Sequence, residues 1–155
     1  MKYEFRFASI LDLRQRERDV AGGLVGEANA AIAKIESQIE ALNQQRQTAL
    51  VEDTEARLGD ISADRLLAQG RYGLQLQAEI QGLEQTRTKL EEELQRRQQK
   101  LRDAETEVKK FQRMQELDAH QHQQAMHRRE QIEIDELNNR RFAMASQNGR
   151  HTDHR

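Results

Sequence analysis

The sequence contains no cysteine, no proline and no tryptophan, and only 4% of its 155 residues are aromatic. Without cysteine, the chain forms no disulfide and carries out no thiol chemistry. Without proline, a long helix is not kinked or broken by a residue that lacks a backbone N–H. Large apolar side chains are too few to enclose a globular core. These absences favour thin, uninterrupted helices over a globular enzyme.

Strong net charge and long apolar runs are also missing. The 25 basic and 27 acidic residues give a net charge of −2 and are interleaved along the chain. This balance provides no long-range attraction to nucleic acid, and aromatic side chains that would stack on bases are scarce. No apolar run approaches the roughly 20 residues of a membrane-spanning helix. We therefore expect a cytoplasmic protein that neither binds nucleic acid nor inserts directly into the membrane.

The sequence does contain a repeated spacing of three and then four residues between apolar side chains. One series runs from Ala21 to Leu42, and a second runs from Leu76 to Phe111. An average spacing of about 3.5 residues places one narrow apolar stripe on each helix, which is the pattern of a coiled coil. The fold class we predict is therefore all-α.

The two series are separated by one turn signal. Gly59 suits the left-handed position that follows a helix, and Asp60 or Ser62 suits the cap of the next helix. The resulting prediction is a helix over about residues 5–57, a turn at 58–61, a helix over about 62–142, and a disordered tail at 143–155. The whole chain is expected to form one long antiparallel two-helix coiled-coil hairpin with an overhanging C-terminal helix.

The hairpin has a testable register. If the chain folds back at the turn, the numbers of facing residues sum to about 119. The facing pairs are then Leu42 with Leu76, Ile39 with Ile80, Ile35 with Leu83, Leu11 with Val108, and Phe7 with Phe111. Both stripes stay in phase, which favours this hairpin over a parallel homodimer. The interface also holds Arg46, Arg87 and Arg97, whose stems we expect to pass along it and release their charges to water.

This register leaves a helix without a partner. Residues from about 115 to 142 lie beyond the end of the first helix, an overhang of roughly 40 Å. A single helix is marginally stable in water, so we expect another protein to bind these residues. The apolar residues of this region are Met114, Leu117, Met126, Ile132, Ile134, Leu137 and Phe142.

Motifs for catalysis or metal binding are not evident. The sequence has no phosphate-binding glycine loop and no Ser-His-Asp pattern. On a helix, His120 and His122 point about 200° apart, and His120 and His127 lie two turns apart, so no pair shares an ion. We expect a protein that is not an enzyme, with no catalytic residue, no metal site and no cofactor.

Three blocks of sequence together resemble a known family. They are the opening Phe5-x-Phe7-x-x-Ile10-Leu11-Asp12-Leu13-Arg14, the turn block Gly59 to Leu66 followed by Tyr72, and the C-terminal block from Glu107 through Phe111 to Glu136. In this order and spacing they are similar to the flagellar export protein FliJ family. The resemblance implies a cytoplasmic component of the flagellar type III export apparatus, peripheral to the inner membrane and serving flagellum biogenesis and motility.

The resemblance also implies partners and contacts. Like the central stalk of rotary ATPases, the open end is expected in the hexameric ring of the export ATPase, and the hairpin end at the cytoplasmic domain of the export gate. Export chaperones are possible further partners. The alternatives are a general export chaperone or chaperone-escort factor, and an unrelated coiled-coil scaffold or tether. The expected gate contacts are Tyr72, Leu42 and Leu76, the latter two also being interface positions. The expected ATPase contacts are Phe7, Arg14, Leu117, Arg128, Arg129, Ile134, Leu137, Arg140 and Arg141.

Overall fold

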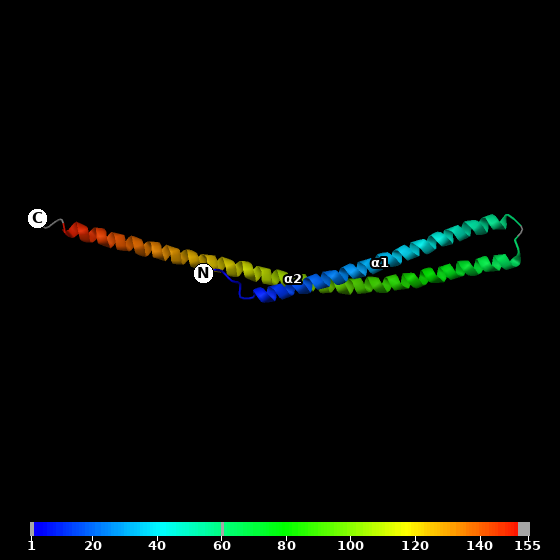
Figure 1. The fold of residues 1–155 in the computed structure, drawn as a ribbon, viewed down its shortest axis with the longest axis horizontal. Coiled ribbons are helices and arrows are strands. Elements are labelled where there is room, and N and C mark those ends of the chain that lie inside the picture. Colours follow the sequence, from blue (N-terminus) through cyan, green and yellow to red (C-terminus); the bar gives the residue numbers. More distant parts are fainter. Residues whose placement is uncertain (1, 60, 152–155) are drawn as a thin grey trace. The chain divides into compact units, whose positions relative to one another are not determined.

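The computed structural model describes residues 2–59 and 61–151 and is built from two helices (Figure 1). Helix α1 spans Ala8–Arg57 and helix α2 spans Ala63–His151. The described residues contain no strand, and the two helices pack against each other, so the predicted all-α two-helix hairpin is confirmed. The chain divides into unit 1, residues 1–13 and 107–155, and unit 2, residues 14–106.

The turn between the helices differs in detail from the prediction. No described glycine has a positive φ, so the left-handed cap expected at Gly59 is wrong. Instead, the amides of Leu58 and Gly59 donate to the carbonyls of Glu55 and Ala56, each at 3.2 Å, which tightens the last turn. The predicted cap at Ser62 is present, since its Oγ accepts from the amide of Arg65 at 3.3 Å. Asp60 lies outside the described residues.

Helix α2 is longer than predicted. It continues past Phe142 to His151, so the disordered tail expected from residue 143 is wrong as far as residue 151. The physical reason is local, because Ala143, Met144 and Ala145 favour helix and no strong breaker precedes Gly149. The rest of the expected tail, residues 152–155, lies outside the described residues.

The core of unit 2 consists of predicted interface residues. Ala28, Ile39, Leu76 and Ile80 are buried, with exposed fractions of 3%, 7%, 3% and 6%. They recur at the spacing of a coiled coil on both helices, which lie side by side in this unit (Figure 1). The apolar stripes read from the sequence are therefore the surfaces that α1 and α2 bury against each other.

Arg97 plays a different part from the one expected. Its Nη1 donates to the backbone carbonyl of Leu24 at 2.7 Å, so the guanidinium joins α2 to α1. Its Nε donates to Glu93 at 3.1 Å. Hydrogen bonds from Arg96 and then Arg97 lower the pKa of Glu93 below its usual value. Arg46, by contrast, is exposed.

The core of unit 1 is an aromatic and aliphatic cluster. Phe5, Leu11 and Val108 are buried, and Tyr3, Phe7, Phe111 and Met114 pack against them. The ring centroids of Phe7 and Phe111 are 6.5 Å apart in an edge-to-face arrangement, and they are one of the pairs predicted to face each other.

Pairing in unit 1 reaches farther along α2 than predicted. The hydroxyl of Tyr3 donates to Oδ2 of Asp118 at 2.9 Å, and its ring centroid lies 5.2 Å from that of His122. Residues 2–5 are not helical. A non-helical backbone covers up to about 3.3 Å per residue against 1.5 Å in a helix, so a few residues reach several turns of α2. The part of α2 in which every residue is exposed therefore begins at Gln123, not near residue 115.

Candidate functional site

Tyr72 lines a groove between the helices at the apex of unit 2, which we define as residues 41–74. Its side chain is 44% exposed, as an anchor for a partner requires. The groove around it is formed mainly by residues of α1. Its lining consists of Ala41, Gln44, Gln45, Thr48, Ala49, Glu52 and Tyr72.

Leu42 and Leu76, the other two predicted gate contacts, belong to the helix interface. Leu76 is only 3% exposed, so a partner cannot reach it, and Leu42 is half-buried. Both residues keep the interface role that the register gave them. They hold together α1 and α2 beside the groove that the side chain of Tyr72 lines.

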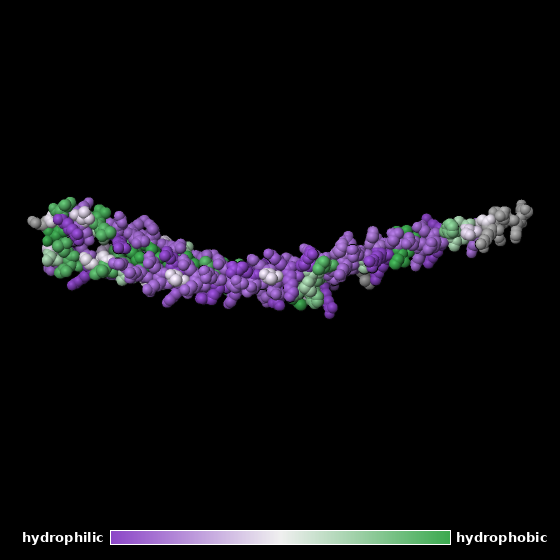
Figure 2. Space-filling view, turned by 180° about the vertical axis from the view of Figure 1, so that it is seen from behind, coloured by the Kyte–Doolittle hydropathy of each residue, from purple (hydrophilic) through white to green (hydrophobic). Residues whose placement is uncertain are grey.

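The apex carries apolar side chains that the sequence reasoning missed. Its interface positions Ala49, Asp53, Ala56 and Gly73 are small or polar and only half-buried, whereas most of its large apolar residues other than Leu42 and Ile61 face solvent. Figure 2 shows this apolar surface gathered where α1 ends and α2 begins. The break in heptad spacing after Leu42 was the available signal. The exposed residues are Leu50, Val51, Leu58, Leu66, Leu67 and Leu74.

A second hollow continues the groove toward the turn. It shares Glu52 with the groove at Tyr72, and residues of both helices line it. One side-chain atom in it, Oε1 of Gln69, is buried without a hydrogen-bond partner. Such an orphaned acceptor is unfavourable until a donor reaches it. The lining residues are Glu52, Glu55, Ala56, Gly59, Ile61, Arg65 and Gln69.

The C-terminal part of α2 in unit 1 is exposed throughout. Every residue of the exposed C-terminal segment, defined as residues 123–148, faces solvent. With 3.6 residues per turn, Leu137 points about 140° and Phe142 about 280° away from Ile132. Apolar groups therefore surround this helix and do not form one stripe. The predicted contacts Ile134 and Leu137 are 50% and 52% exposed, and Arg128, Arg129, Arg140 and Arg141 are also exposed.

The remaining predicted ATPase contacts lie outside that segment. Leu117 is 49% exposed on α2. Phe7 is half-buried in the unit 1 cluster, where it packs against Phe5 and Phe111. In unit 2, Arg14 pairs with Glu17 at 3.0 Å. Phe7 and Arg14 thus have roles within the fold, and Leu117 alone of the three presents its side chain freely.

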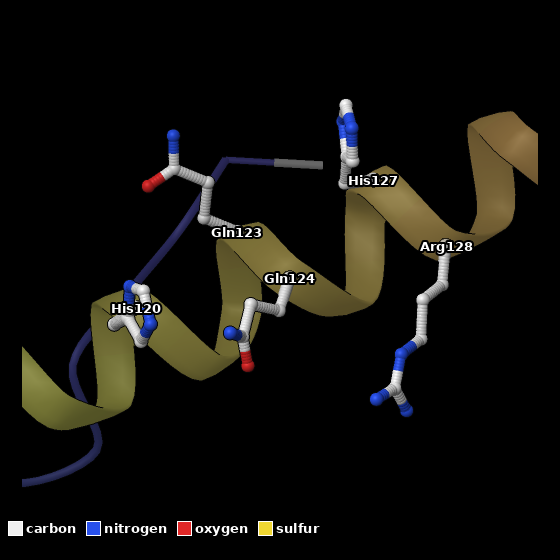
Figure 3. Close-up of a pocket in the computed structure, with 5 residues that line it drawn as sticks. All are labelled: His120, Gln123, Gln124, His127 and Arg128. Atoms are coloured by element: carbon white, nitrogen blue, oxygen red, sulfur yellow. The ribbon is translucent and has the colours of Figure 1, made fainter.

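His120, His122 and His127 of α2 do not gather into one cluster. His120 and His127 emerge from separate turns of the helix and do not converge on one point (Figure 3). Among residues 2–59 and 61–151, no group of three or more metal-ligating side chains comes together. His122 instead lies against the ring of Tyr3.

The comparisons with known proteins agree with this arrangement. The model of a family described as flagellar FliJ protein matches residues 1–147. The chain belongs to the FliJ family. Members of the FliJ family are non-catalytic proteins of flagellar export. Membership therefore argues against the alternative of a coiled-coil scaffold unrelated to export. No curated protein and no solved structure matches the chain. Neither α1 nor α2, within the described residues, is long and apolar enough to cross a membrane.

Proposed function

We propose that this FliJ-family protein couples the flagellar export ATPase to the export gate as a stalk-like rod. The exposed C-terminal segment enters the hexameric ring of the ATPase, and the apex binds the cytoplasmic domain of the gate. These partners hold the protein at the cytoplasmic face of the inner membrane. The proposal rests on family membership together with the two exposed apolar surfaces.

The observation that carries the ATPase assignment is the distribution of apolar groups around the exposed C-terminal segment. A helix that docks in a groove needs one apolar stripe, as in other helix-in-groove complexes. Here Ile132, Leu137 and Phe142 point in three different directions, which suits a receptor that surrounds the helix. The bore of a ring is such a receptor, and the interleaved arginines suit acidic or carbonyl-lined loops within it.

Coupling requires more than binding. A rod in a sixfold ring contacts the six subunits unequally, so it biases their nucleotide states only if it binds those states with different affinities. The expected signature is stimulation of ATP hydrolysis, because a ligand with equal affinity for every state shifts no equilibrium.

The test compares ATPase stimulation by the full chain and by a chain that ends at His122. This truncation keeps the contacts of Tyr3 with Asp118 and His122, so unit 1 should retain its cluster. We expect the truncated chain to lose both ring binding and stimulation. Equal stimulation by both chains would place the contact elsewhere and remove the ATPase assignment.

The gate assignment is tested separately with Tyr72→Ala. The matched control is Leu24→Ala, which removes a side chain of similar exposure, 39%, away from the apex. We expect Tyr72→Ala to weaken binding to the purified cytoplasmic domain of the gate and Leu24→Ala to leave it unchanged. Unchanged binding by both variants would rule out Tyr72 as the anchor.

A further inference from the structure

The two hollows at the apex follow one another along the hairpin. They share Glu52, and together their lining runs from Ala41 of α1 to Gly59, two residues beyond the end of this helix. The part within α1, from Ala41 to Arg57, is about 24 Å long at 1.5 Å per residue, and Leu58 and Gly59 extend it slightly. We call the two hollows together the apex groove. A groove of this length between two antiparallel helices matches a third helix of about 18 residues packed along both.

The chemistry of the apex groove is acidic and apolar. Glu52 and Glu55 are exposed, and neither has an ion-pair partner among the residues that the structure describes. The lining includes one cationic side chain, that of Arg65. Tyr72 and Ile61 supply the large apolar surface. A partner that complements this lining carries lysine or arginine beside an apolar stripe.

Gln69 adds an independent indication of an occupant. Its Oε1 is buried in this groove yet accepts no hydrogen bond, and a buried acceptor without a donor costs stability. If the amide of Gln69 turns toward the groove, an ammonium or guanidinium group from a partner supplies the missing donor. The same groups would lie near Glu52 and Glu55, which line the same hollow.

We propose that the apex groove binds a basic amphipathic helix of a partner protein. Its apolar stripe packs on Tyr72 and Ile61, and its cationic side chains pair with Glu52 and Glu55. On the function proposed above, this helix belongs to the export gate. The complex is then a local three-helix bundle at the apex.

The direct test uses two synthetic 18-residue helical peptides and the full chain. One peptide has a leucine stripe flanked by lysines, and the other has the same stripe flanked by glutamates. We expect the lysine peptide to bind, more weakly as salt is raised, because exposed ion pairs are screened. The glutamate peptide should not bind. Equal binding of the two peptides, or no binding of the lysine peptide, overturns the proposal.

Variants locate the binding to the groove. Glu52→Gln with Glu55→Gln should weaken binding of the lysine peptide about fivefold, as expected for two exposed ion pairs. Glu36→Gln with Glu40→Gln removes the same charge from exposed positions of α1 outside the groove and serves as the matched control. An equal effect of both double variants would mean non-specific attraction and would overturn the proposal. An unchanged thermal unfolding midpoint of both double variants verifies that they keep the fold.

A second probe separates this proposal from the gate assignment. If the gate domain binds the wild-type chain but is insensitive to Glu52→Gln with Glu55→Gln, the basic-helix proposal fails while the gate assignment stands. If the lysine peptide binds in the groove but the gate domain does not bind at all, the gate assignment fails. Sedimentation of the chain alone reports whether a second copy occupies the groove, a result that would also overturn the proposal.

Discussion

The hydroxyl of Tyr3 donates a 2.9 Å hydrogen bond to Oδ2 of Asp118, joining residues 115 positions apart. The segment before α1 is thereby attached to α2 beyond the predicted end of the pairing. Burial, followed by the hydrogen bond and the charge of Asp118, raises the pKa of Tyr3 above its usual value of 10. This attachment has a measurable pH dependence.

Tyr3 should titrate at higher pH in the folded chain than in urea. A raised pKa means that the contact contributes its full stability below about pH 10 and loses it as pH rises through the folded value. The chain has two tyrosines, so a Tyr72→Phe background leaves Tyr3 as the only phenol for ultraviolet titration. Asp118→Asn should move the midpoint back toward the unfolded one. Identical folded and unfolded midpoints would contradict the contact.

Glu93→Gln should reduce the loss of folding stability that occurs as the pH is lowered. Because the pKa of Glu93 is lowered by Arg96 and Arg97, its contribution is present above about pH 4.5 and disappears as pH falls through the folded value. Thermal unfolding at pH 6 and at pH 3.5 measures this difference. Glu92→Gln is the control, because Glu92 is exposed next to the network. If the two variants lose stability alike on acidification, Glu93 has no special role.

Replacing Ile39 and Ile80 together by aspartate should unfold much of unit 2. Both residues are buried, and introducing two charges into the interface should cost roughly 3 kcal/mol or more. Circular dichroism and thermal melting report the loss. Leu74→Asp is the matched control, since Leu74 is 69% exposed and its replacement should change stability by about 0.5 kcal/mol or less. A double variant as stable as the control would refute the register.

Cysteines placed at Ile35 and Leu83 should form a disulfide within one chain. Both positions are half-buried and were predicted to face each other, and the chain has no cysteine of its own to compete. Non-reducing electrophoresis distinguishes a bridged monomer from a dimer. Cysteines at Ile35 and Leu76 are two helical turns out of register and should bridge poorly. Dimers from the facing pair would favour association between chains.

The periodic part of the fold could be read from the sequence. Ile39, Leu76, Ile80 and Val108 are buried as predicted, because heptad spacing is a local property that both helices carry independently. The cap at Ser62 could be read for the same reason, since capping depends on a few neighbouring residues. The end of α2 could not, because fraying depends on small differences in helix propensity summed over the last turns.

The sequence by itself determined two helices, the apolar stripes that they bury and the family, since each depends on residue types at regular spacing. Only the tertiary structure decided which side chains a partner can reach. It buried Leu76 and left Tyr72 open, and it directed Arg97 to the carbonyl of Leu24. It also joined Tyr3 to Asp118. These results depend on the placement of single side chains from distant parts of the chain, and a repeating pattern carries no information about that placement.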